Sequence, residues 1–409
     1  MVLKTTTGQI VSALDTADSL SRHELARRTG LTRATVTNIV RPLLGCGFLY
    51  ETGSASASRR GGPRPTPLRI RASALQFAGL DIRREKISAC LVDLRGEMTA
   101  FDTRELSIGA SRGDVLSAID ALLVELMGAA VSPVTALGVG SVGPVVGDEG
   151  VIQSIHFPAL RGFDIAGYLE RVHGIPVTIQ TGAVAAAYGE ERIARRQQRP
   201  ATSVAFVVID YAGIGLGLIS GGEGWITDHG GVGELGHLSI DRAGRACECG
   251  RRGCLLQYSS GRAVLQALGR LDGDDGAAFA RVARNADAGD EAAQAALIEA
   301  GDHLAHGIVD ADSLLRPGRI VLGSSHPRMA DWYLQGVRRH LDGLPDREGG
   351  RALRDRLYLS ELGTAAICYG AANRELKAFL DAPDAHVKRL GASSADAWSA
   401  AEGDRSTAT

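Results

Sequence analysis

The sequence has few cysteines and no long uninterrupted apolar run. Six cysteines are scattered over 409 residues, too few for a disulfide framework, and this usage is typical of a reducing cytosol. The first ten residues, MVLKTTTGQI, lack the apolar core of a secretory signal. Because Asp210 interrupts the most apolar later stretch, SVAFVVIDYAGIGLGLI, we expect no membrane span and a cytoplasmic location.

A net charge near zero conceals an uneven distribution. The formal net charge is -2. Residues 1–71 hold eleven Lys and Arg against four Asp and Glu, a net charge of +7, and the remainder carries -9. A basic head on an acidic body predicts that only the head meets a polyanion. With 44% hydrophobic residues, the chain can also form two or three domains with cores of their own.

One stretch, Gly233 to Cys254, concentrates metal-binding residue types. It reads GELGHLSIDRAGRACECGRRGC, so that His237 is followed by Cys247, Cys249 and Cys254. Three thiolates and one imidazole complete the tetrahedral set that Zn2+ prefers, and they leave no open position for a catalytic water. The intervening glycines suit a tight knuckle. We predict a structural zinc site, with three buried or redox-active thiols as the alternative.

The head has the pattern of a helix-turn-helix. Residues 8–20 show the apolar spacing of a first short helix. Ser21 and Glu24 form a capping-box pattern that starts a second helix, and Thr32 can cap a third, RATVTNIVRPLL. Two helices joined by a short turn that contains Gly are typical of this motif. Pro42 lies inside the third helix and is expected to kink it or end it early.

Side chains suited to DNA follow the turn. We expect the exposed face of the third helix to present Arg33, Thr35, Thr37, Asn38 and Arg41 to base edges and phosphates. The opposite face is expected to turn inward Ala34, Val36, Ile39, Val40 and Leu43. The next segment, GFLYETGSASASRRGGPRPTPLRI, predicts a two-stranded wing whose extended tip suits a minor groove through Arg59, Arg60 and Arg64. Turn, wing and charge together predict double-stranded DNA binding; a protein-interaction module with a solvated basic face is the alternative.

From Leu75 onward the pattern is α/β. Two strand-turn-strand units, in LQFAGLDIRREKISACLVDLRGEMTAF and SVAFVVIDYAGIGLGLISGGEGW, suggest two related halves. Helical apolar spacing follows in GDVLSAIDALLVELMGAA and again in AAQAALIEAGDHLAHGIVDADSLL. The segment GTAAICYGAANRELKAFL predicts a last helix, and the aperiodic tail after it is expected to be disordered.

These features together resemble the ROK family of repressors, open reading frames and sugar kinases. The resemblance runs from about residue 8 to 380 and is carried by the basic winged head, ELGH at 234–237 and CECGRRGC at 247–254. It implies an actin-like (ribonuclease H-like) two-lobed body of the ATPase type, a ligand cleft between the lobes, a structural zinc near that cleft, and a homodimer or homotetramer. We expect a winged helix-turn-helix at 1–72, a first lobe at 73–190 completed by a helix near 363–380, a second lobe at 191–362, and a tail at 381–409.

The residues that the family's kinases use for chemistry are replaced. Their phosphate loop resembles DIGGTK, whereas Asp81 is followed here by Ile82, Arg83, Arg84, Glu85 and Lys86. Their catalytic Asp lies in an NDANAA segment, where this chain has Gly182. The nearest acid, Glu190, is two helical turns further on and is expected on a helix face. A second glycine-rich loop, Ala212–Gly217, remains, and a tight hairpin turn explains it better than phosphate binding.

The sugar site implied by the resemblance is only partly present. Glu234 and His237 remain, but Thr181, Gly182 and Leu256 replace the other three ligands. A hexose would lose most of its orienting hydrogen bonds. His237 is expected to ligate zinc; orienting a ligand hydroxyl through its second ring nitrogen is the alternative.

The segment 154–164 borders the expected cleft. His156 and Arg161 in it suit an anionic ligand such as a sugar phosphate, or are surface residues. We therefore predict a nucleoid-associated transcriptional repressor with a non-catalytic body, responsive to a sugar or sugar phosphate. A sugar kinase with an accessory DNA-binding head, and a scaffold that has lost DNA binding, are the alternatives.

Overall fold

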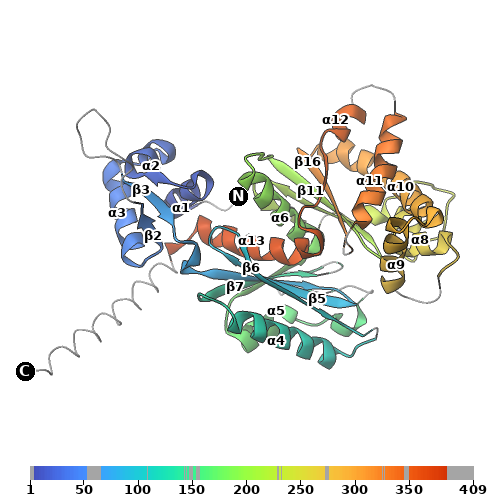
Figure 1. Ribbon diagram of the computed structural model, residues 1–409, viewed down its shortest axis with the longest axis horizontal. Helices are drawn as coiled ribbons and strands as arrows, with labels where there is room; N and C mark the ends of the chain where they lie inside the picture. Colours follow the sequence, from blue (N-terminus) through green and yellow to red (C-terminus); the bar gives the residue numbers. More distant parts are fainter. Residues whose placement is uncertain are drawn as a thin grey trace, which may run out of the picture.

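The computed structural model describes most of the chain (Figure 1). Its described residues are 4–52, 66–107, 109–141, 143, 145–146, 151–152, 157–227, 230–231, 233–271, 276–324, 326, 328–344 and 350–384. Arg59, Arg60, Arg64 and His156 therefore lie outside them. No helix in these ranges is both long enough and apolar enough to cross a membrane.

The head contains three helices and a small sheet. The helices are α1 (Thr6–Ala17), α2 (Arg22–Thr29) and α3 (Arg33–Gly45), and the strands are β1 (Leu20–Ser21), β2 (Leu49–Glu51) and β3 (Pro67–Ile70) in the order β1-β3-β2. The predicted capping box is confirmed, since the Ser21 hydroxyl accepts from the Glu24 amide and a Glu24 carboxylate oxygen accepts from the Ser21 amide at 2.8 Å. The Thr32 side chain likewise caps α3.

For α3, the expected early end at Pro42 and the inward position of Ala34 are wrong, whereas a kink at Pro42 stays a prediction. Pro42 does not end the helix, because the Cys46 amide donates to the Pro42 carbonyl at 3.0 Å and the ladder resumes at once. The carbonyl that loses its partner belongs to Asn38, which is exposed, so water can solvate it. Ala34 is exposed rather than inward, whereas Val36 and Val40 are fully buried.

The body begins with a five-stranded sheet, which together with its covering helices we call the first lobe. Its order is β10-β7-β4-β5-β6, with β4 to β6 antiparallel and β7 and β10 parallel to β4. The bounds are β4 (Gln76–Ile82), β5 (Lys86–Asp93), β6 (Met98–Glu105), β7 (Val134–Ser141), β10 (Val177–Thr181), α4 (Arg112–Gly128) and α5 (Ile165–His173). Figure 1 shows α4 and α5 covering the face of this sheet that is turned away from the rest of the body.

A second sheet, the core of what we call the second lobe, repeats this topology. Its order is β13-β12-β11-β16-β17, again an antiparallel meander followed by two parallel strands. The predicted two related halves and the actin-like fold class are thereby confirmed. The strands are β11 (Ser203–Ile209), β12 (Ile214–Ser220), β13 (Glu223–Gly224), β16 (Arg319–Ser324) and β17 (Leu357–Leu359).

Further helices and short hairpins complete the body. The helices of the second lobe are α7 (Leu256–Ser259), α8 (Gly261–Ala267), α9 (Gly276–Asp287), α10 (Glu291–Leu315), α11 (Met329–Asp342) and α12 (Gly350–Arg354). Two-residue strands pair as β8 (Val145–Val146) with β9 (Val151–Ile152) and β14 (Ile226–Thr227) with β15 (Gly230–Gly231).

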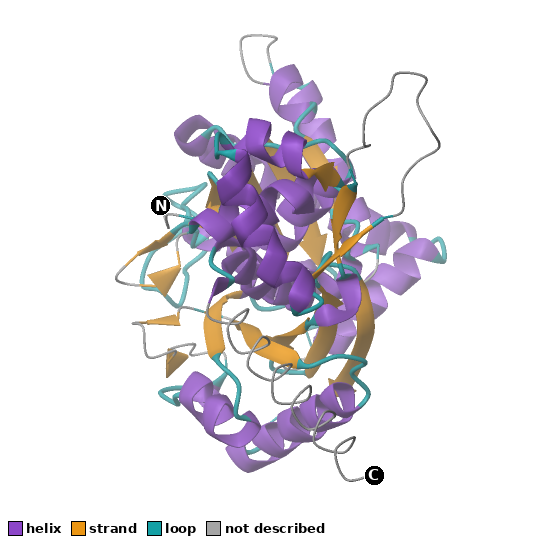
Figure 2. Ribbon diagram, turned by 90° about the vertical axis from the view of Figure 1, so that its left-hand side faces the viewer, coloured by secondary structure: helices purple, strands orange, loops and turns teal. Residues whose placement is uncertain are grey.

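Two helices, α6 (Gly182–Arg196) and α13 (Ala366–Asp381), lie between the two sheets (Figures 1 and 2). Helix α13 packs on the first sheet, α6 packs on the second, and the two helices pack on each other. Glycine allows this close approach. A Cβ at Gly79 would lie 1.9 Å from the Cys368 carbonyl oxygen, and one at Gly217 would lie 2.1 Å from the Ala183 backbone.

The head is docked on the body by apolar and ionic contacts. The Phe379 ring of α13 lies 5.8 Å from Phe48 of the head and 5.4 Å from Phe77 of β4, measured between centroids. Both Arg192 side-chain Nη atoms of α6 donate to the Asp15 carboxylate of α1, at 2.6 and 2.7 Å. The head therefore shares a continuous core with the first lobe.

We expect Arg192→Ala to lower the free energy of unfolding by about 3 kcal/mol, because it leaves the largely buried Asp15 carboxylate without its cation. Arg104→Ala is the matched control. Arg104 pairs with solvent-exposed Asp102 and Glu125, so its loss should leave stability nearly unchanged. Urea unfolding measures both variants, and equal losses would contradict this interpretation.

Candidate functional site

A cavity of about 460 Å³ lies between the two lobes. Its walls come from the β4–β5 turn, the first residues of α6 and α13, the β11–β12 hairpin, the ELGH segment and α9. Thr181, Gly182, Glu234, His237 and Leu256, the positions singled out in the sequence, all lie on this wall. The volume is within the range of small-molecule sites.

The charges on the described part of the cavity wall are balanced. The cationic side chains are Arg83, Arg84, Lys86 and Arg284, and the acidic ones are Glu85, Glu105, Asp210 and Glu234. Most other wall residues are glycines and apolar side chains. Charges of opposite sign in equal number, with apolar surface between them, suit a small ligand without a strong net charge.

Arg83 lies in the turn between β4 and β5 and bridges two carboxylates. Its Nε donates to Asp81 at 2.8 Å and its Nη1 donates to Asp210 at 3.0 Å. Arg83 is 7% exposed. Burial alone would lower the pKa of Arg83, but Asp81 and Asp210 outweigh burial and the pKa is raised, so the guanidinium stays charged.

Gly182 has no side chain that could accept a proton in the cavity. Glu190 does not supply a proton acceptor there either. Glu190 is 4% exposed, is absent from the described cavity wall, and accepts a hydrogen bond from the Ser360 hydroxyl at 2.6 Å. Burial, opposed by that hydrogen bond, raises the pKa of Glu190 to about 7. Glu190 therefore lies on a buried face of α6.

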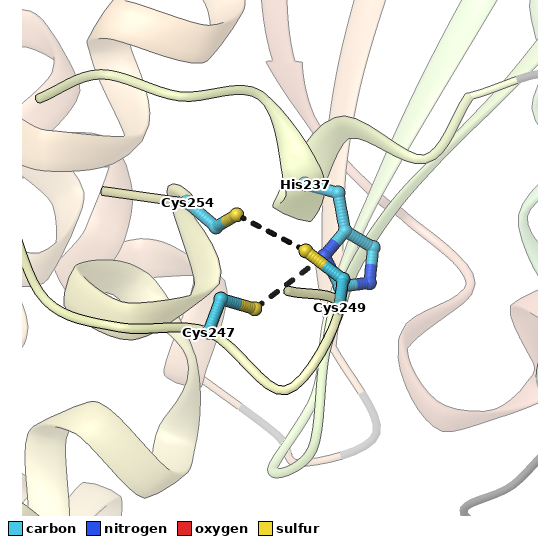
Figure 3. A group of neighbouring side chains, drawn as sticks. All are labelled: His237, Cys247, Cys249 and Cys254. Atoms are coloured by element: carbon cyan, nitrogen blue, oxygen red, sulfur yellow. Dashed lines mark hydrogen bonds between the residues drawn. The ribbon is translucent and has the colours of Figure 1, made fainter. Parts of the chain in front are cut away.

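His237, Cys247, Cys249 and Cys254 converge on one point (Figure 3). Their ligand atoms all lie within 4.8 Å of one another. Cys247 Sγ lies 3.7 Å from His237 Nδ1, and Cys249 Sγ lies 3.6 Å from Cys254 Sγ. Ligands around a tetrahedral zinc ion are about 3.6–3.8 Å apart, so the four residues fit a metal ion. The sulfur separation excludes a disulfide in this arrangement.

Local backbone geometry brings these four side chains together, and we refer to them as the candidate metal-binding cluster. Gly250 and Gly253 have φ values of 84° and 67°, which other residues rarely adopt, and a Cβ at Gly253 would lie 1.6 Å from the Asp241 carbonyl oxygen. His237 ends a short 3-10 turn, Leu235–His237, and also lies on the cavity wall. The cluster therefore fixes part of that wall.

The predicted DNA-contacting residues of α3 lie on one face. Arg33, Asn38 and Arg41 are exposed, and Thr35 and Thr37 are half-buried. The Thr37 hydroxyl donates to the Arg33 carbonyl at 2.9 Å, so α3 itself engages this side chain. The face is thus polar and basic, with its three longest side chains accessible.

Comparison with known proteins agrees with this architecture. Residues 77–373 match the model of the ROK family, and residues 7–53 match that of the IclR helix-turn-helix domain. The chain belongs to the ROK family.

Relatives of this ROK protein include repressors and kinases. The xylose repressor of Bacillus subtilis (strain 168) is 27% identical over 367 residues, which cover 88% of this chain and 92% of that protein. An N-acetylmannosamine kinase of Escherichia fergusonii is 31% identical over 272 residues, which cover 64% of this chain and 87% of the kinase. A crystal structure of a ROK family transcriptional regulator, a homolog of the E. coli MLC protein, shares the fold with a TM-score of 0.73 at 21% identity, over 94% of this chain and 98% of that one.

Sequence reasoning missed Asp210, Arg284 and His326 as cavity residues. A signal for Asp210 was present, because it follows the first strand of the second half as Asp81 ends the first strand of the first half. Nothing in the local sequence marks Arg284 or His326. Burial lowers the pKa of His326 to about 4, so its ring is neutral at physiological pH.

We expect Glu190→Gln to change how stability depends on pH. Because the pKa rises from 4.5 to about 7 on folding, the protonated carboxyl stabilises the folded state below pH 4.5, and this contribution is lost as the pH rises through 7. At about pH 8 the variant should therefore be more stable, by on the order of 3 kcal/mol. Thermal unfolding measured from below pH 4.5 to about pH 8 checks this, and parallel stability curves for both proteins would contradict it.

Proposed function

We propose that this ROK protein is a DNA-binding transcriptional repressor, acting in the cytoplasm at the nucleoid, whose sugar-kinase-like body does not catalyse phosphoryl transfer. The observation that carries the proposal is the exposed basic face of α3 on a head docked firmly to a ROK body. The similarity to the xylose repressor and, at 25% identity, to the E. coli transcriptional repressor Mlc supports it.

The head is proposed to place α3 in a major groove. Arg33, Asn38 and Arg41 have the length and chemistry to reach base edges and phosphates. Thr35 suits a phosphate, and Thr37, whose hydroxyl donates to the Arg33 carbonyl, would contact DNA through its methyl group. Arg59, Arg60 and Arg64 of the wing tip would add minor-groove contacts. Two heads in a homodimer or homotetramer would match two half-sites of a palindromic operator.

Loss of catalysis is proposed from two substitutions. Gly182 stands where a kinase needs a proton acceptor, and Arg83 occupies the turn that would approach a phosphate. The similarity to a N-acetylmannosamine kinase is the argument for the alternative function. That similarity does not provide a proton acceptor at Gly182 or open the turn that Arg83 occupies.

The cavity is proposed to bind a carbohydrate effector. Its balanced charge favours a neutral sugar over a sugar phosphate, and Glu234 and His237 remain to accept or donate hydrogen bonds to hydroxyls. His156, which lies outside the described residues, is proposed as a further ligand-binding residue.

Both helices between the sheets run from the cavity to the head. Gly182 at the start of α6 and Ile367 at the start of α13 are on the cavity wall. Further along, Arg192 and Phe379 contact the head. A ligand that moves either helix would therefore move α3, which is how an effector would alter operator binding.

We also propose that the candidate metal-binding cluster holds a structural zinc ion through His237, Cys247, Cys249 and Cys254. Membership of strands in the two sheets supports a division into a DNA-binding domain, a first lobe and a second lobe with the zinc knuckle. We place these at 1–72, 73–190 with 363–380, and 191–362. The tail, expected at 381–409, starts one residue later, because Asp381 is the last residue of α13 and is buried.

Asn38→Ala should weaken binding to an operator in the DNA upstream of the protein's own gene by about 1–3 kcal/mol, since Asn pairs with adenine in two hydrogen bonds. Gln9→Ala, which removes another exposed amide from the head, is the matched control and should bind as the parent does. Footprinting locates the site, and fluorescence anisotropy at several salt concentrations measures affinity. If the parent shows no salt-dependent duplex binding, the proposed function fails.

Purified protein should contain about one zinc ion per chain by mass spectrometry of the metal content. Cys254→Ser should lose the ion and unfold at a lower temperature, because ligand loss removes binding energy from the folded state. The control variant Cys46→Ser, which changes a cysteine of the head, should keep the zinc ion. Zinc retained in the Cys254 variant, or none in the parent, would disprove the assignment.

A further inference from the structure

The two carboxylates bridged by Arg83 occupy equivalent places in the two lobes. Asp81 is near the end of β4, the first strand of one sheet, and Asp210 directly follows β11, the first strand of the other. Arg83 donates to both, so one guanidinium spans the floor of the cleft from lobe to lobe.

A second contact crosses the cleft beside it. Glu85, two residues further along the same turn, accepts a hydrogen bond from the Gly276 amide at 2.9 Å. Gly276 is the first residue of α9, a helix of the second lobe, where free amides favour an anion. The approach depends on glycine, because a Cβ at this position would lie 2.1 Å from a Glu85 carboxylate oxygen.

We propose that Arg83 and Glu85 tie the two lobes together across the cleft, so that the chain's own guanidinium and carboxylate serve as the bridging cation and anion in place of a charged ligand. The cleft is therefore held in one closure without a nucleotide, and the remaining cavity is left for an uncharged molecule.

The burial and the charges around Arg83 and Glu85 support this role. Asp81 is 1% exposed and its Oδ1 has no hydrogen-bond partner, so Arg83 is its main electrostatic compensation. Lys86, Glu105, Arg284 and His326 also face the cavity and leave the surrounding charge nearly balanced. Removing one member of such a set leaves a buried charge uncompensated, which is costly.

The proposal goes beyond DNA binding and can fail independently of it. Hydrogen exchange of backbone amides in the full-length protein tests it with two variants. Arg83→Ala removes the bridging cation, and Gly276→Ala displaces Glu85 without changing any charge. Both should speed exchange in the first turn of α9 and in the β11–β12 hairpin by about tenfold or more. X-ray scattering should show a larger radius of gyration.

Two matched control variants distinguish loss of the contacts between the lobes from general destabilisation of the fold. Arg104→Ala removes an arginine that bridges residues of the first lobe alone. Gly113→Ala adds a methyl group to the first turn of α4, where a Cβ would meet only the Ser111 hydroxyl at 3.7 Å. Both should leave exchange in the second lobe unchanged.

Faster exchange confined to the β4–β5 turn, with α9 and the hairpin unaffected, would overturn the proposal. If Arg83→Ala does not fold, Gly276→Ala decides the question by itself, and parental exchange and dimensions in that variant would also overturn it.

Discussion

The packing of α13 between the head and the first sheet is the contact on which the rest of the structure depends. Phe379 lies against one aromatic ring of the head and one of β4, so the head has no separate core. Strand glycines such as Gly79 allow the helix backbone to reach the sheet. A DNA-binding module joined in this way takes its orientation from the body rather than from a flexible linker.

The cleft is crossed by side chains of the chain itself. Arg83 neutralises two carboxylates, one in each lobe, and Glu85 accepts a hydrogen bond from the first residue of α9. His237 belongs both to the cavity wall and to the candidate metal-binding cluster. The cavity is therefore bounded by fixed groups, and helices α6 and α13 lead from it to the head.

Patterns among residues close in the sequence were sufficient to predict several structural features. The capping box at Ser21, the cap at Thr32 and the convergence of His237 with three cysteines depend on residues close in sequence, and they could be predicted. The repeated strand-turn-strand units gave the two related halves. The early end expected at Pro42 was wrong because a proline in the last turn costs only one hydrogen bond, that to the carbonyl of the exposed residue Asn38.

Contacts between distant residues could not be predicted. The bridge from Arg83 to Asp210 joins residues 127 apart, and that from Arg192 to Asp15 joins residues 177 apart. In the sequence, Arg83 and Arg192 are simply cations in a turn and on a helix. Only the duplicated topology and the docking of the head give these side chains their partners.

The central claim is that the head and the first lobe form one cooperative unit. Native-state hydrogen exchange measures this most directly, by comparing the opening free energy of buried amides in α3 with that of amides in β4 and β5 as denaturant is added. The account predicts that the two sets converge on one value and one denaturant dependence. Head amides that exchange through a separate, lower-energy opening while β4 and β5 remain protected would contradict it.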